Sequence, residues 1–194
     1  MIKRTRIKEI TSYIRSSILV LFISTFIEIL VGSFLGEAFY NIYFPGILIL
    51  IPPMMELRGN ISSAFAAKLG TALHIGTVKP KFRNNTKKFK DDFNSIIIIL
   101  VLMPIILGIF VWIYCLILNI PNIGVLWFII IALLTGLISG LIMTVITVLI
   151  SILTFKYGLD PDALVVPILG FVGDILTITV LFVITDFFII MGVF

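Results

Sequence analysis

Long apolar runs constrain the fold of this chain more than any other feature. A bilayer core of about 30 Å needs about 20 apolar residues in a helix, and runs of that length recur five times between charged or turn-rich segments. We therefore predict an all-α, polytopic membrane protein with five transmembrane helices per chain. The five predicted helices are Ser16–Leu35, Tyr43–Thr77, Phe93–Leu118, Ile123–Phe155 and Asp162–Ile190.

The composition excludes an ordinary soluble domain. Of the 194 residues, 60% are hydrophobic and 12% are charged, whereas soluble domains average about 45–50% and about 25%. Cys115 is the only cysteine, so neither a disulfide framework nor a cysteine metal cluster is expected. The net charge of +4 comes from basic residues at the ends of apolar runs without interleaved aromatic residues. That pattern argues against nucleic acid as a partner and for membrane lipid.

Basic residues mark one side of the membrane. They gather in the N-terminal arm at residues 1–15, in the predicted loop Val78–Asp92 and at Lys156 in the next loop on that side. With five spans all these segments fall on one side, which the positive-inside rule makes the cytoplasm. We expect a cell-membrane protein with a basic cytoplasmic arm over residues 1–15, a transmembrane domain over residues 16–194, a cytoplasmic N-terminus and an outside C-terminus.

Polar residues enter the predicted membrane helices mainly in the second and fifth spans. An ionisable group at mid-bilayer costs about 2.5–3.5 kcal/mol on insertion scales, so it usually faces protein, water or an ion. Counting residues places Ser63 and Asp174 at comparable depth, about 24 and 21 Å from the cytoplasmic boundary. The residues singled out are Glu56, Arg58, Asn60 and Ser63 in the second span, and Pro167, Gly170, Asp174 and Thr177, which share one helical face, in the fifth.

The oxygen atoms of that face suit a hard divalent cation. It offers the carboxylate of Asp174, the hydroxyl of Thr177 and a backbone carbonyl at Gly170 that no side chain covers. Magnesium keeps several of its waters, so one or two carboxylates plus carbonyls are sufficient ligands. One aspartate per chain is few, but two chains meeting on a two-fold axis supply a pair. We predict Mg²⁺ as the transported ion, in a polar path between two copies of the chain.

Structural roles remain open for several of these residues. Asp174 is alternatively a buried carboxylate that pairs with Arg58 or Lys68 and holds helices together. Glu56 and Arg58 are alternatively a self-neutralising pair near the outer surface. Glu28, in the first span, is either a helix contact or an ion ligand.

Small residues in the fourth span predict close helix packing. Gly136 and Gly140 are four residues apart and therefore lie on one helical face. Such small-xxx-small pairs let two helix backbones approach each other. We expect this face to contact another helix rather than to carry chemistry.

Two segments resemble the signatures of a known family. Pro53-Met-Met-Glu-Leu-Arg-Gly-Asn60 resembles the second-helix signature of the MgtE-type magnesium transporters. Gly158-Leu-Asp-Pro-Asp162, followed by the segment from Pro167 to Thr177, resembles the fifth-helix signature of that family. The resemblance is closest to the branch containing the animal solute-carrier magnesium transporters, where a Lys-Gly-Asn or Gly-Gly-Asn triplet opens a similar run. The order of five spans agrees with the family's membrane domain.

The resemblance implies a homodimer whose second and fifth helices line a central pore. The aspartate that matches Asp174 holds a hydrated magnesium ion in that family, and Gly170 matches a position whose carbonyl contributes. Asn60 and Ser63 match the polar start of the pore-lining second helix. Arg58 stands where bacterial members carry glycine, which leaves the ion selectivity open. The candidates for the pore or its mouth are Glu56, Arg58, Asp162, Pro167 and Glu28.

Two other function classes remain as alternatives. The first is a non-conducting assembly subunit that needs a paralogous half as partner, since the animal proteins carry two copies of this domain. The second is a metal-dependent intramembrane lipid enzyme, which would need several carboxylates within reach of one another. Asp160 and Asp162 lie about 18 Å or more from Asp174 along one helix. The sequence therefore predicts a transporter rather than an enzyme.

Overall fold

The computed structural model describes residues 45–82, 84–157 and 161–193, with side chains in the last range from residue 169 onward. Within these ranges the chain forms four helices, α2 (Pro45–Ile75), α3 (Lys87–Ile117), α4 (Val125–Lys156) and α5 (Pro161–Ile190). The N-terminal arm lies outside the described residues. So does the predicted first span Ser16–Leu35, except for helical positions 18, 22, 25, 26, 29, 32 and 33.

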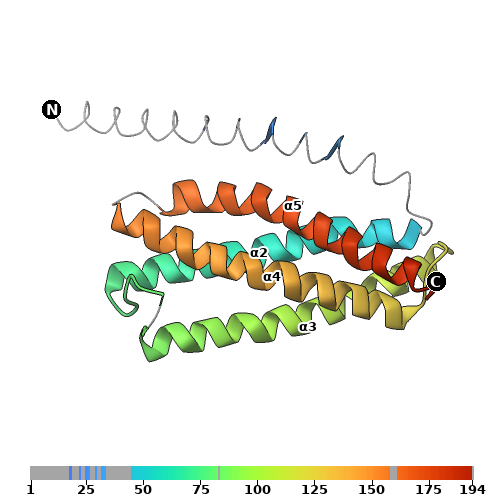
Figure 1. Cartoon of the computed structure of the whole chain (residues 1–194), viewed down its shortest axis with the longest axis horizontal. Coiled ribbons are helices and arrows are strands. Elements are labelled where there is room, and N and C mark those ends of the chain that lie inside the picture. Colours follow the sequence, from blue (N-terminus) through green and yellow to red (C-terminus); the bar gives the residue numbers. More distant parts are fainter. Residues whose placement is uncertain are drawn as a thin grey trace.

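The four helices lie side by side in a bundle, and successive helices run in opposite directions (Figure 1). Helices α2 and α4 contact each other, and both also contact α3 and α5. Helices α2 and α4 end, and helices α3 and α5 begin, at one end of the bundle, and the C-terminus lies at the other (Figure 1). The described basic residues between α2 and α3 and Lys156 at the end of α4 therefore share the first of these ends, which we call the basic end.

Three of the described helices are long and apolar enough to cross a membrane. They are Lys87–Ile117, Val125–Lys156 and Leu169–Ile190. Helix α2 has 31 residues, and both of its ends lie within two residues of the predicted bounds. It is not among these three helices, and Pro52, Pro53 and the charged side chains that follow interrupt its apolar sequence. The all-helical fold is thus confirmed for the described part of the chain, and three of its helices have the length and composition of membrane spans.

The predicted basic loop Val78–Asp92 is wrong in its second half, because α3 begins at Lys87 rather than at Phe93. Thr86 caps the helix: its Oγ1 accepts a hydrogen bond from the backbone N–H of Phe89. A cap of this kind satisfies one of the N–H groups that a helix start leaves without an intrahelical partner. The lysine-rich run is therefore the first turn of a helix rather than a loop.

An ion-pair cluster joins the start of α3 to α2. Asp92 Oδ1 accepts hydrogen bonds from Lys88 Nζ at 3.0 Å, one turn earlier, and from Lys68 Nζ of α2 at 2.7 Å. The Asp92 side chain is 9% exposed, whereas both lysine side chains are about half exposed. These contacts hold the two helix ends together at the basic end of the bundle.

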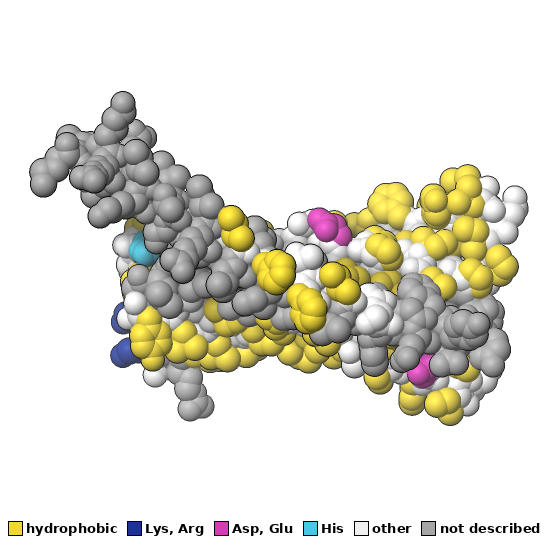
Figure 2. All heavy atoms as spheres, turned by 90° about the horizontal axis from the view of Figure 1, so that it is seen from above, with side chains coloured by type: hydrophobic (Ala, Val, Ile, Leu, Met, Phe, Trp, Pro, Cys, Tyr) yellow, Lys and Arg dark blue, Asp and Glu magenta, His cyan; other side chains and the backbone are white. Residues whose placement is uncertain are grey.

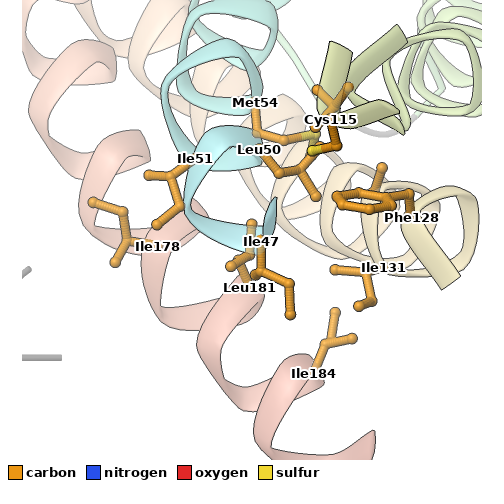
Figure 3. Close-up of a cluster of buried hydrophobic side chains, with 12 residues drawn as sticks. Ile47, Leu50, Ile51, Met54, Cys115, Phe128, Ile131, Ile178, Leu181 and Ile184 are labelled. Carbon is orange, nitrogen blue, oxygen red and sulfur yellow. The ribbon is translucent and has the colours of Figure 1, made fainter. Parts of the chain in front are cut away.

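The largest cluster of buried residues in the described part of the chain draws on all four helices (Figure 3). It includes Ile47 near the start of α2 and Ile184 near the end of α5, so it lies away from the basic end. Met54, at its inner edge, is one helical turn before Arg58. Lipid tails are as apolar as these side chains, so close packing rather than exclusion of water stabilises such contacts in a membrane. The buried members are Ile47, Leu50, Ile51, Met54, Val111, Cys115, Phe128, Ile131, Ala132, Ile178, Leu181 and Ile184.

Glycines of α4 bring it against α3, as the sequence predicts. A Cβ atom at Gly136 would overlap the ring of Pro104, and one at Gly140 would overlap the side chain of Leu100. Both partners belong to α3. The absence of a side chain at these two positions therefore permits the close α3–α4 packing.

Hydrophobic side chains dominate the visible described surface, and the Lys and Arg side chains in that view lie at one end (Figure 2). One exposed apolar stripe follows α3 at four-residue spacing through Ile98, Leu102, Ile106 and Phe110. A helix face of this kind suits contact with lipid.

Substituting Gly136 tests the packing of α4 on α3. Gly136→Ala places a methyl group against the rigid ring of Pro104, so we expect the free energy of unfolding to fall by about 1–3 kcal/mol. Gly59→Ala is the matched control, because its Cβ meets no atom within 4 Å, and it should leave stability unchanged or raise it by about 0.5–1 kcal/mol. Thermal unfolding in detergent measures both. Equal effects of the two substitutions would contradict the packing described here.

Candidate cation site between α2 and α5

A pocket of about 510 Å³ lies between α2 and α5. It brings together two carboxylates, Glu56 and Asp174, and the guanidinium of Arg58. Arg58 and Glu56 precede Asp174 by 116 and 118 positions in the sequence, and the packing of α2 on α5 brings them to one pocket. The lining residues are Leu48, Ile51, Pro52, Met55, Glu56, Arg58 and Gly59 from α2, with Gly170 and Asp174 from α5.

Arg58 binds three oxygen atoms of α5. Its Nη2 donates to Asp174 Oδ1 at 2.5 Å and to the carbonyl oxygen of Gly170 at 3.3 Å, and its Nη1 donates to the carbonyl oxygen of Leu169 at 3.0 Å. The Arg58 side chain is 4% exposed and that of Asp174 is 19% exposed. The pairing of Asp174 with Arg58, one of the structural alternatives raised by the sequence, is therefore formed.

Arg58 lies on the inward-facing stripe of α2. Buried residues recur along this helix every three or four positions, as the 3.6-residue period requires for one face. Met54 precedes Arg58 on that stripe and Ser62 follows it. This spacing is the sequence signal that would have placed Arg58 inside rather than at the mouth of the path.

Glycines shape the space around the guanidinium. A Cβ atom at Gly173 would overlap the guanidinium of Arg58, so the missing side chain of Gly173 forms its seat. At Gly59 and Gly170 a Cβ atom would meet nothing within 4 Å. The guanidinium therefore packs closely against Gly173. The pocket beside it has open space at Gly59 and Gly170, which line it.

Glu56 does not pair with Arg58, although the sequence left that pairing open. Its Oε1 accepts a hydrogen bond from Asn60 Nδ2 at 2.9 Å, one turn further along α2. Both Glu56 and Asn60 are exposed. The carboxylate of Glu56 thus remains at the surface of the pocket.

Among the predicted site residues whose side chains the structure describes, Asn60, Ser63 and Thr177 do not line the pocket. Ser63 donates its hydroxyl to the carbonyl oxygen of Gly59, and Thr177, which is buried, donates to that of Gly173 at 2.8 Å. The side chains of Asp162 and Pro167 lie outside the described part of α5, and Glu28 also lies outside the described residues.

The site supplies oxygen atoms to a cation. A carboxylate and two backbone carbonyls of α5 point at one positively charged group, and these are the ligand types that hard cations prefer. Within the described part of the chain, no three His, Cys, Asp or Glu side chains gather into a metal-ligand cluster. The oxygen atoms around Asp174 therefore form one set of acceptors, and the guanidinium of Arg58 occupies it.

Comparison with known families assigns most of the chain to a transporter family. The model of a family described as MgtE, a divalent cation transporter, matches residues 51–184. The matched region covers well over half of the chain and includes the whole of the α2–α5 pocket except Leu48. Neither a curated protein sequence nor a solved structure matches the chain.

A double-mutant cycle tests the energetic weight of the Arg58–Asp174 pair. Arg58→Gln or Asp174→Asn alone leaves one buried charge without its partner, so we expect each to lower the free energy of unfolding by about 3 kcal/mol. The double variant should lose clearly less than the sum. Chemical or thermal unfolding in detergent provides the measurement.

The control cycle uses Lys68→Gln and Asp92→Asn. Lys68 is 52% exposed, so the expected coupling in that pair is about 0–1 kcal/mol. Strict additivity at Arg58 and Asp174 would show that the two charges do not stabilise each other.

Proposed function

The chain belongs to the MgtE family of divalent cation transporters, and from that premise we propose that it conducts magnesium along the α2–α5 surface as half of a two-fold homodimer. Membership of the family makes the chain a membrane protein of divalent cation transport rather than a member of an enzyme family. The choice of magnesium, the pore helices and the dimer are the proposal. Each rests on the geometry of the pocket between α2 and α5.

The convergence of oxygen ligands at Asp174 carries the proposal. Its carboxylate and the carbonyl oxygens of Leu169 and Gly170 bind the same positive group, while Glu56 lines the opposite, α2 side of the pocket. Magnesium is held in proteins by one or two carboxylates and retained waters. A pocket of about 510 Å³ has room for such a hydrated ion.

The polar surface of α2 supports a second copy as partner. Glu56 and Asn60 are exposed on a helix of the membrane bundle, and polar groups that face lipid are unfavourable. A second chain placed on a two-fold axis over this surface would cover both residues. It would also bring a second Asp174 to the path.

The basic connections support a cytoplasmic position for one end of the bundle. That end, where α2 and α4 end and α3 and α5 begin (Figure 1), carries Lys79, Lys81, Lys87 and Lys156. By the positive-inside rule this end faces the cytoplasm and the C-terminus lies outside. We also propose five spans with the N-terminus in the cytoplasm. Within the family, we propose that the chain is most similar to the branch containing the animal solute-carrier magnesium transporters.

One observation favours a second candidate function, a non-conducting subunit that pairs with a paralogous half. Arg58 already neutralises the carboxylate of Asp174. A subunit whose cation site is permanently filled would complete a dimer without conducting. The purified chain would then carry no magnesium alone, whereas the main proposal requires that it does.

Magnesium uptake into liposomes tests the main proposal. We expect the purified chain to admit Mg²⁺ to an entrapped magnesium dye, and Asp174→Asn to lower the initial rate by about tenfold or more, because the path loses its charged ligand. Asp186→Asn is the matched control, since it makes the same exchange at an exposed position of the same helix, and it should conduct like the parent chain.

Two results of this assay would contradict the proposal. The first is folded, dimeric parent protein that admits no magnesium, which would favour the non-conducting subunit. The second is Asp174→Asn protein that conducts like the parent chain, which would place the path elsewhere.

A further inference from the structure

Arg58 occupies the ligands that the proposed function assigns to a divalent cation. Its guanidinium donates to Asp174 Oδ1 and to the carbonyl oxygens of Leu169 and Gly170. Resting on the proposed function, we propose that Arg58 is a tethered competitor of the transported cation and sets the selectivity of the site for divalent over monovalent ions. A cation binds at Asp174 only when the guanidinium leaves its seat.

Geometry makes the two occupants mutually exclusive. The guanidinium nitrogens lie 2.5 to 3.3 Å from all three oxygen atoms, so an ion that bound the same oxygens would overlap them. Charge acts in the same direction, because the guanidinium and a cation repel each other, and a divalent ion is repelled about twice as strongly as a monovalent ion at the same distance. Binding of the ion therefore requires displacement of Arg58.

The seat of Arg58 allows this displacement. Three hydrogen bonds are made by a group with five N–H donors, and Nε has no partner among the described residues. The pocket that Arg58 lines is open at Gly59 and Gly170, where an added Cβ would meet nothing within 4 Å beyond its own stretch of helix. Glu56 lines the same pocket and offers a second carboxylate to a displaced guanidinium.

Displacement discriminates between ions by their charge. A monovalent ion brings to the carboxylate of Asp174 the same unit charge that Arg58 already supplies, and Arg58 has the additional advantage of its covalent attachment. A divalent ion brings twice the charge and interacts about twice as strongly with the same carboxylate. Removal of the guanidinium should therefore strengthen divalent binding and also admit monovalent ions.

Full-length purified protein can test this with two readouts. The first is the Mg²⁺ concentration that gives half of the maximal protection against thermal unfolding in detergent. The second is the half-saturating Mg²⁺ concentration and the K⁺ permeability in liposomes. We expect Arg58→Gln to lower both magnesium midpoints by about tenfold or more, and to raise K⁺ permeability. Arg58→Gln combined with Asp174→Asn should lose the magnesium protection.

A second variant keeps every charge of the chain. Gly173→Ala inserts a methyl group where the guanidinium sits, so it should also lower the magnesium midpoint, although Arg58 and Asp174 are both present. It provides the test if Arg58→Gln does not fold. Lys68→Gln is the matched control, because it removes another cation of α2 whose partner is Asp92, and it should leave both midpoints within about twofold of the parent values.

The outcomes separate this inference from the proposed function. Midpoints of Arg58→Gln or of folded Gly173→Ala that equal those of the parent chain would overturn the competition, even if magnesium is transported. Lowered protection midpoints without flux in any variant would uphold the competition and overturn transport by the chain alone. A merely structural Arg58 predicts lost stability that magnesium does not restore.

Discussion

The ion pair between Arg58 and Asp174 is the interaction on which the α2–α5 half of the bundle depends. A charged side chain on a membrane helix is unfavourable unless it faces protein, water or an ion, and here each charge supplies the partner of the other. Leu169 and Gly170 add two carbonyl oxygens. Because these acceptors belong to consecutive turns of α5, the hydrogen bonds from the guanidinium fix the position of this part of α5 against α2.

The remaining structure accommodates this pair through close packing. Gly173 leaves room for the guanidinium, and the buried cluster around Met54 holds α2 against α5 beside it (Figure 3). On α4, the missing side chain of Gly136 leaves room for the ring of Pro104 of α3. Such contacts matter more in lipid than in water, because helix association there gains little from burying apolar surface. Close packing therefore holds the helices on both sides of the proposed cation path in fixed positions.

Sequence reasoning predicted the helices from their apolar runs, and it singled out Glu56, Gly170 and Asp174, which line one pocket. It placed the start of α3 wrongly, because a lysine-rich run is typical of a loop. In the structure Thr86 caps the helix and the lysines form its first turn. It named Arg58 as a pore or mouth residue and left open whether Asp174 pairs with Arg58 or with Lys68. The helical period of the buried residues on α2 indicates that Arg58 faces inward, but the choice between the two partners depends on how α5 packs against α2.

The central claim is that guanidinium and cation share one set of oxygen atoms at Asp174. The most direct measurement is the position of Mn²⁺, used as a magnesium substitute with a strong anomalous signal, in crystals of the parent protein and of Arg58→Gln. The account predicts a Mn²⁺ peak at the Asp174 carboxylate and the Gly170 carbonyl in the variant. In the parent protein it predicts either that peak with Arg58 displaced, or no peak with Arg58 seated. A peak at these oxygens beside a seated guanidinium would contradict the account, as would a peak in the variant only at other residues.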